Sequence, residues 1–195
     1  MRNSIALSAL AAATGALAVP APSDCATGLH IIVARGSSEE PGMGRAGVVA
    51  GNITLEIPGS DSVGVDYPAT FSAYDDSKSE GSSEMAHMVF DYKKQCPDTK
   101  IALIGFSQGA HALMDLLCNT DIEEGYTLPA ERVDEFWQNV VAAVAFGDPS
   151  HSPGHPWNAG DADTEGVSLT SITVPFLTQP VANREMTITA VSPSR

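Results

Sequence analysis

The stretch Ile101-Ala102-Leu103-Ile104-Gly105-Phe106-Ser107-Gln108-Gly109 decides the fold of this chain. Its apolar start predicts a buried strand, and the residues from Gln108 onward predict a helix. Gly-x-Ser-x-Gly between a strand and a helix is typical of a nucleophile elbow, where the glycines permit a sharp reversal and the serine is held in a strained backbone conformation. The free N–H groups of the new helix point to the same place, where an acyl transfer develops negative charge. We therefore predict that Ser107 is a nucleophile.

Apolar runs alternate with helical patterns along the rest of the chain. The residues predict strands at 29–34, 63–66, 101–105 and 140–146, and helices at 45–55, 83–94 and 108–118. This order predicts an α/β fold, a mostly parallel sheet with helices on both faces. Active sites in such sheets lie at the carboxyl ends of the strands. Three segments are expected there: Arg35-Gly36-Ser37-Ser38, the elbow around Ser107, and Gly147-Asp148-Pro149.

The first residues are typical of a secretory leader. Arg2 precedes an apolar stretch from Ile5 to Ala18, which is too short to span a bilayer comfortably and is followed by Val19-Pro20. We expect residues 1–18 to be a signal peptide and the protein to be extracellular. No other segment approaches the length and apolarity of a membrane span. Residues 19–166 are expected to form one domain, which is large enough for a proper core.

The chain is strongly acidic, with a formal net charge of −14. Such a charge repels nucleic acid and anionic membranes, so we expect neither as a partner. Neutral polymers and small neutral esters are easier partners for this surface. The acidity is equally well explained as a means of keeping a secreted protein soluble.

Several short motifs, in this order, resemble those of the cutinase family, which includes the acetylxylan esterases. They are Ile32-Val33-Ala34-Arg35-Gly36-Ser37, Val65-Asp66-Tyr67-Pro68-Ala69, Cys96-Pro97-Asp98-Thr99-Lys100, Gly105-Phe106-Ser107-Gln108-Gly109-Ala110 and Ala145-Phe146-Gly147-Asp148-Pro149. The resemblance implies a minimal α/β-hydrolase fold. It also implies a secreted, monomeric carboxylic ester hydrolase that forms an acyl-serine intermediate on plant cell-wall esters, either acetylated xylan or cutin-like esters, without metal or cofactor.

The resemblance also assigns roles to individual residues. It makes Ser107 the nucleophile and the backbone N–H of Gln108 one donor of the oxyanion hole. Ser37 stands at the position that supplies a second donor. A serine that only stabilises its own turn remains the alternative for Ser37.

The chain has three cysteines, and an oxidising compartment favours their pairing. Cys25 and Cys96 each precede a strand and are able to bridge neighbouring strand starts; the resemblance makes them the family's first disulfide. Cys118 is then left over, either as a buried free thiol or with a partner outside this chain. Asn52-Ile53-Thr54 is a candidate glycosylation site.

The last segment departs from the family pattern. Cutinases carry their catalytic aspartate and histidine late in the chain, whereas residues 167–195 contain no Asp, His or Cys. We therefore expect an atypical tail that is not family sequence and a sheet that is incomplete at its C-terminal end. A serine hydroxyl without an adjacent base is a poor nucleophile, so a non-catalytic cutinase-like protein is the alternative function.

Other histidines are possible replacements for the missing base. His30 and His87 are expected to be structural. His111 lies one helical turn beyond Ser107, but helical side chains lean toward the N-terminus while the elbow serine points off the helix end, so no direct contact is expected. His151 and His155 lie in the loop after the fourth strand, near the predicted catalytic edge. An aspartate from the same region would orient one of them, the candidates being Asp148, Asp161 and Asp163.

Overall fold

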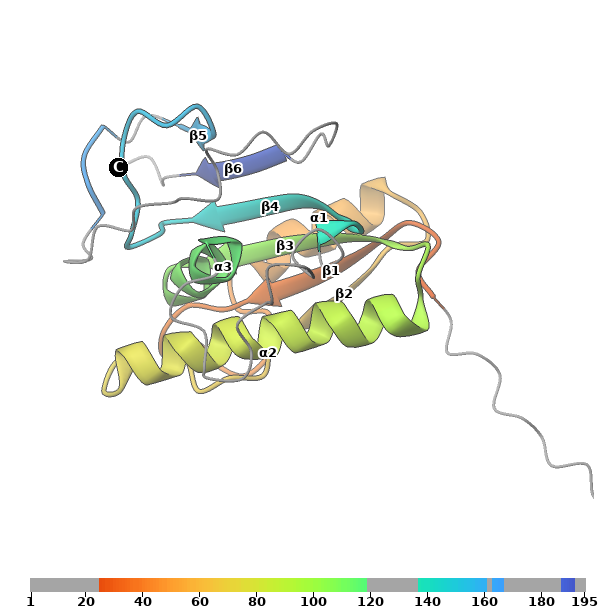
Figure 1. Cartoon of the computed structure of the whole chain (residues 1–195), viewed down its shortest axis with the longest axis horizontal. Helices are drawn as coiled ribbons and strands as arrows, with labels where there is room; N and C mark the ends of the chain where they lie inside the picture. The colour runs from red at the N-terminus through yellow and green to blue at the C-terminus, as the bar shows by residue number, and fades with distance from the viewer. Residues whose placement is uncertain (1–24, 119–136, 161–162, 167–186, 192–195) are drawn as a thin grey trace, which may run out of the picture.

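A six-stranded parallel sheet in the order β2-β1-β3-β4-β6-β5 runs through the part of the chain that the structure describes. The structure is a computed structural model that describes residues 25–118, 137–160, 163–166 and 187–191. The elements are β1 (Leu29–Ala34), α1 (Gly47–Glu56), β2 (Asp61–Gly64), α2 (Tyr74–Gln95), β3 (Lys100–Phe106), α3 (Gln108–Cys118), β4 (Val140–Phe146), β5 (Asn158–Ala159) and β6 (Thr187–Val191) (Figure 1). This arrangement confirms the predicted α/β class with helices on both faces.

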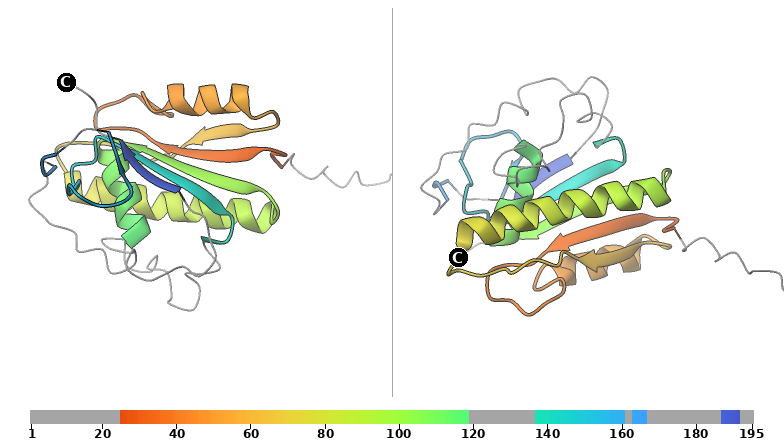
Figure 2. Two further views of the ribbon diagram at one scale, coloured as in Figure 1. Left: turned by 90° about the horizontal axis from the view of Figure 1, so that it is seen from above. Right: turned by 60° about the horizontal axis from the view of Figure 1, so that its bottom comes forward.

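Alternate residues of the central strands build two separate cores. Ile31 and Val33 of β1 face one side of the sheet and pack with Ala50 of α1. Ile32 and Ala34 face the other side and join the larger core, which includes residues of α2 and α3. Figure 2 shows α1 on one side of the sheet and α2 and α3 on the other. The central strands are therefore apolar on both faces, as parallel strands covered by helices usually are.

The first helical segment, the second strand and the second helix differ from their predicted bounds. The helix predicted at 83–94 spans Tyr74–Gln95. Its first half was not predicted because it buries small and polar side chains rather than an apolar stripe. The helix predicted at 45–55 spans Gly47–Glu56. The strand predicted at 63–66 spans Asp61–Gly64, although Val65 still donates its N–H to Val33 O at 2.8 Å.

The disulfide between Cys25 and Cys96 forms as predicted, across a sequence separation of 71 residues. It joins the starts of β1 and β3, at the opposite end of the sheet from Ser107. Closing a loop of this length stabilises the fold by about 4 kcal/mol in the chain-entropy model.

Two short strands that the sequence did not predict extend the sheet beyond β4. Strand β6 pairs with β4, with Ala142 opposite Thr187 and Phe146 opposite Val191. The two-residue β5 pairs with β6. The rest of the tail expected to be atypical, like the expected signal peptide at 1–18, lies outside the described residues. Within the described part of the chain, no helix has the length and apolarity needed to cross a membrane.

Candidate active site

Ser107 stands at the tip of the turn between β3 and α3 in a left-handed backbone conformation, with φ of 53°. A residue other than glycine rarely adopts this conformation, and it persists only where the surrounding structure holds it. Two backbone hydrogen bonds do so here: Ser107 donates its N–H to Phe146 O at 2.9 Å, and His111 donates its N–H to Ser107 O at 3.0 Å. The predicted elbow geometry is therefore present.

The two glycines of the motif are required by close packing. A Cβ added to Gly105 would lie 2.4 Å from Gly109 O, and one added to Gly109 would lie 2.3 Å from Ala34 O. These neighbours are backbone atoms, which have no side-chain freedom to move aside. The helix is thus able to start directly against the ends of β1 and β3 only with glycine at both positions.

Ser37 lies in the loop that follows β1, at the same edge of the sheet. Its hydroxyl oxygen is buried and has no hydrogen-bond partner within the described structure. The next residue, Ser38, has φ of 60° and donates its N–H to Ala69 O at 2.7 Å. A buried hydroxyl without a partner is costly unless a ligand satisfies it, so Ser37 has the properties expected of a donor that waits for an oxyanion.

Gln108 follows the nucleophile and is fully buried. Its side-chain amide donates to Thr70 O at 3.0 Å and to Tyr74 O at 3.4 Å, and its Oε1 accepts from the Ser77 hydroxyl at 3.2 Å. The side chain is therefore fully used in the structure. Its backbone N–H is one of the first in α3, where no intrahelical partner exists.

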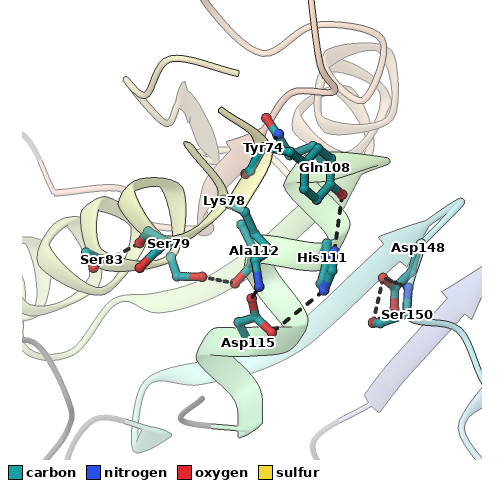
Figure 3. A network of polar contacts seen from close by, with 11 residues as sticks. Tyr74, Lys78, Ser79, Ser83, Gln108, His111, Ala112, Asp115, Asp148 and Ser150 are labelled. Atoms are coloured by element: carbon teal, nitrogen blue, oxygen red, sulfur yellow. Dashed lines mark hydrogen bonds and ion pairs between the residues drawn. The ribbon is translucent and has the colours of Figure 1, made fainter. Parts of the chain in front are cut away.

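A buried ion pair beneath the elbow was not predicted from the sequence. Lys78 Nζ of α2 lies 2.7 Å from Asp115 Oδ2 of α3, and both side chains are almost inaccessible. His111 Nε2 lies 4.0 Å from Asp115 Oδ1, and His111 Nδ1 is 3.1 Å from the Tyr74 hydroxyl (Figure 3). The sequence contains one indication of this network: an aspartate inside the apolar run Leu113-Met114-Asp115-Leu116-Leu117 needs a buried partner. This network joins α2 to α3.

Tyr74 remains protonated in this network. Burial raises the pKa of its hydroxyl, and the negative charges of Asp148 and Asp115 raise it further. The hydroxyl is therefore a neutral partner for His111 and not a source of negative charge near the elbow. The His111 ring contacts Tyr74 and Asp115.

The loop after β4 brings Asp148 and His151 to the same edge of the sheet as Ser107. Asp148 is buried and accepts hydrogen bonds from Ser150 N at 2.9 Å and from the Ser150 hydroxyl at 2.8 Å. Burial raises the pKa of its carboxyl, although Ser150 and the nearby His151 act against that change. The Nε2 atom of His151 is buried and has no hydrogen-bond partner among the described residues.

All five histidines of the chain lie in the described residues, and none of the hydrogen bonds that their rings make there reaches the Ser107 hydroxyl. His30 bonds Asp61 at 2.6 Å and stacks on Tyr92 near the disulfide end of the sheet. His87 lies 3.6 Å from Glu84 on α2. His155 is exposed and stacks on Trp157. Of the proposed partners, Asp163 is exposed and Asp161 lies outside the described residues.

Two further predicted residues lie away from the elbow. Asn52 is exposed on α1, as a glycosylation acceptor must be. Cys118, at the end of α3, is a buried free thiol, and burial raises its pKa to about 12. Such a thiol is protonated and unreactive at neutral pH.

Comparisons with known proteins place this geometry in a family. The family model described as Cutinase matches residues 25–186. The chain belongs to the cutinase family. Acetylxylan esterase 2 of Talaromyces purpureogenus is 31% identical over 147 residues, which cover 71% of this chain and 63% of that protein. Cutinase 11 of Verticillium dahliae is also 31% identical over 147 residues, covering 71% of this chain and 50% of that protein. The chain therefore spans between half and two thirds of the length of these relatives.

Solved structures show the same fold. The catalytic core domain of acetyl xylan esterase from Trichoderma reesei matches with a TM-score of 0.69 at 26% identity, covering 87% of this chain and 84% of that structure. These comparisons confirm the expected membership of the cutinase family and its α/β-hydrolase fold.

Proposed function

We propose that the protein is a secreted carboxylic ester hydrolase with Ser107 as its nucleophile. The observation that carries this proposal is the pairing of a strained serine at an elbow with a buried, unpartnered hydroxyl on the adjacent loop. The elbow presents Ser107 at the sheet edge, and the Ser37 hydroxyl and the Gln108 N–H supply two donors for a tetrahedral oxyanion. Each such donor stabilises the transition state by about 3 kcal/mol.

The reaction follows from these positions. Ser107 Oγ attacks the ester carbonyl carbon while its proton passes to a base, and the carbonyl oxygen becomes an oxyanion held by Ser37 and Gln108. The tetrahedral species collapses to an acyl-serine and releases the alcohol, which takes up the proton. Water then attacks the acyl-serine by the same route and releases the acid. Every step is a proton or acyl transfer that side chains and water are able to perform.

His151 is the histidine with the best position to act as the base. It lies in the loop at the carboxyl end of β4, next to the strand that presents Ser107, and its Nε2 is buried without a hydrogen-bond partner among the described residues. Of the other four histidines, His111 is bonded to Tyr74 and His155 is exposed. His30 contacts Asp61 and His87 lies near Glu84. Catalytic hydrogen bonds often tighten only when substrate binds, so the absence of a contact to Ser107 in the free protein does not rule His151 out.

Plant cell-wall esters are the substrates that we propose, either acetylated xylan or cutin-like esters. Relatives named acetylxylan esterase and cutinase support both, and the acidic chain is compatible with a neutral polymer. We expect a monomer that is exported after removal of residues 1–18, with Asn52 as the site of any N-linked glycan.

A direct test measures ester hydrolysis by purified protein and by its Ser107→Ala variant. p-Nitrophenyl acetate and a longer-chain p-nitrophenyl ester report the acyl preference, while acetylated xylan and a cutin-like polyester report the polymer. We expect turnover that disappears in the variant. Equal rates for the two proteins would refute the role of Ser107.

A non-catalytic relative is the second candidate, favoured by the absence of a hydrogen bond between the Ser107 hydroxyl and any histidine ring among the described residues. Weak turnover alone does not separate the two, because an oxyanion hole without a working triad retains roughly 10³- to 10⁴-fold acceleration. Covalent trapping of Ser107 by a fluorophosphonate does, since rapid reaction requires an activated hydroxyl.

A further inference from the structure

Arg35, the residue directly after β1, has its guanidinium buried at the catalytic edge of the sheet. It is 3% exposed, and its hydrogen bonds within the described structure go to backbone carbonyls. Nη1 donates to Val65 O at 3.1 Å, Nη2 to Tyr67 O at 2.5 Å, and Nε to Glu39 O at 3.1 Å. One side chain thus holds its own loop and the segment that follows β2.

Tyr67 completes this contact from the other side. Its hydroxyl donates to Arg35 O at 2.5 Å, and the Arg35 Cζ lies 5.0 Å from the centre of its ring. The ring itself rests against α2, where a Cβ on Gly81 would lie 2.9 Å from it. Burial raises the pKa of the Tyr67 hydroxyl, so it stays protonated and able to donate. We call Arg35 and Tyr67 the arginine clasp. Two of its four hydrogen bonds join the two residues, and the other two run from Arg35 to Val65 O and Glu39 O.

The segment 65–70, called here the spacer, contacts the loops of both oxyanion donors. On the Ser37 side, Ser38 donates its N–H to Ala69 O at 2.7 Å, next to the contacts of the clasp. On the Gln108 side, the Gln108 amide donates to Thr70 O at 3.0 Å. The spacer is therefore hydrogen-bonded both to the residue that follows Ser37 and to the side chain of Gln108.

The chemistry of the clasp requires arginine. Within the described residues no carboxylate lies within ion-pair distance of the Arg35 guanidinium, because the Glu39 carboxylate instead accepts the Gly36 and Arg45 N–H groups. A planar guanidinium is able to reach three carbonyls at fixed angles, whereas a lysine ammonium has a single nitrogen on a flexible stem. Tyr67 occurs in the motif Val65–Ala69, which the proposed reaction does not otherwise use, and Arg35 stands two residues before Ser37.

We propose that Arg35 and Tyr67 are positioning residues that set the distance between the Ser37 and Gln108 oxyanion donors through the spacer. This inference rests on the proposed function, since it concerns the same site. It assigns no contact between the clasp and the substrate. A loosened clasp lets the Ser37 loop move relative to the elbow, so that the two donors no longer converge on one oxygen. Misplacement of this kind by about 1 Å lowers a catalytic rate by about 100-fold.

The test compares Arg35→Lys and Tyr67→Phe with the control Arg45→Lys, a matched change in the same loop at a side chain that is 82% exposed. Two measurements are made on each protein: amide hydrogen exchange of residues 36–45 and 65–70, and the second-order rate constant for labelling of Ser107 by a fluorophosphonate. The first does not depend on catalysis. Tyr67→Phe removes only one hydroxyl and serves if Arg35→Lys fails to fold.

We expect Arg35→Lys to speed exchange in both segments while exchange in β3 and α3 stays unchanged. Labelling should slow by about 10- to 100-fold, with a fall in kcat and an unchanged KM for ester hydrolysis. Tyr67→Phe should show the same pattern to a smaller degree, and Arg45→Lys should stay within about twofold of the wild type, as an exposed substitution usually does.

Unchanged exchange in both clasp variants would overturn the proposal, as would faster exchange with an unchanged labelling rate. A wild-type protein that does not react with the probe refutes the proposed function instead. In that case the exchange measurement alone decides whether the clasp holds the two segments together.

Discussion

The loops at the ends of β1 and β3 and the loop after β4 meet at one edge of the sheet but differ in how they are built. The first pair is held by the elbow, the arginine clasp and the buried Lys78–Asp115 pair, with glycines that admit no Cβ. In the loop after β4, the Asp148 carboxylate accepts a hydrogen bond from the N–H of Ser150, two residues later. The Nε2 atom of His151 has no hydrogen-bond partner among the described residues. We infer that contacts between separate elements fix the loops of the proposed nucleophile and oxyanion donors, whereas in the loop after β4, the proposed acid–base half, the Asp148 carboxylate is hydrogen-bonded only locally and His151 Nε2 has no partner among the described residues.

The largest expected effect is the loss of unfolding free energy when one methyl group is added to a glycine in each of the two regions. Gly109→Ala places a Cβ 2.3 Å from Ala34 O, whereas Gly154→Ala in the loop after β4 meets nothing within 4 Å and has only its φ of +84° to overcome. We expect Gly109→Ala to lose about 4 kcal/mol or more of unfolding free energy, together with all Ser107 labelling. Gly154→Ala should lose about 1 kcal/mol. Denaturant unfolding measures both, and similar losses would remove the contrast.

The buried ion pair gives the next effect. Lys78→Met leaves the Asp115 carboxylate buried without its cation and should lower the unfolding free energy by about 3 kcal/mol. Lys94→Met, a change at an exposed lysine of the same helix, is the control and should stay within about 0.5 kcal/mol. The double variant Lys78→Met/Asp115→Leu should recover part of the loss. A Lys78→Met protein as stable as the control would show that the pair does not join α2 to α3.

The third prediction concerns the acid–base half. His151→Ala should slow fluorophosphonate labelling of Ser107 by about 100-fold or more, the usual contribution of a general base. His155→Ala, with its exposed ring stacked on Trp157, should change it by less than about twofold. Equal rates for the two variants would exclude His151 as the base.

The smallest effect is a pH dependence. Because burial raises the pKa of Asp148, its ionised form costs folding free energy: the cost is absent at low pH, where the carboxyl is protonated in both states, and is complete above the folded pKa. Asp148→Asn keeps an acceptor for Ser150 and should raise the Tm at pH 7 without changing it at pH 3. Thermal unfolding at the two pH values measures this, and a lower Tm for the variant at pH 7 would contradict it.

The sequence predicted the elements that have a regular apolar period. Strands β1 and β4 and helix α3 have the predicted bounds, because each is a continuous apolar run or an amphipathic segment next to a turn. The first half of α2 was missed because its buried face consists of Ser77, Lys78, Gly81 and Ser82, which have no apolar period. Strand β6 was missed because its pairing with β4 is set by tertiary contact.

The residues of the candidate site also fall into those that a local motif predicts and those that only tertiary contacts bring together. The elbow follows from a local motif, so Ser107 and its glycines are visible in the sequence. The arginine clasp joins residues about thirty positions apart through backbone carbonyls, for which the sequence carries no pattern. The lack of a hydrogen-bond partner for His151 Nε2 among the described residues likewise depends on how its loop folds.

The proposed function requires Ser107 to be an activated nucleophile in a preformed site. The most direct test is the intact mass of the protein after exposure to a fluorophosphonate, with Ser107→Ala as control and peptide mapping of the adduct. We expect one adduct on the peptide that carries Ser107 and none on the variant. A wild-type protein that stays unlabelled, or a variant labelled equally well, would contradict it.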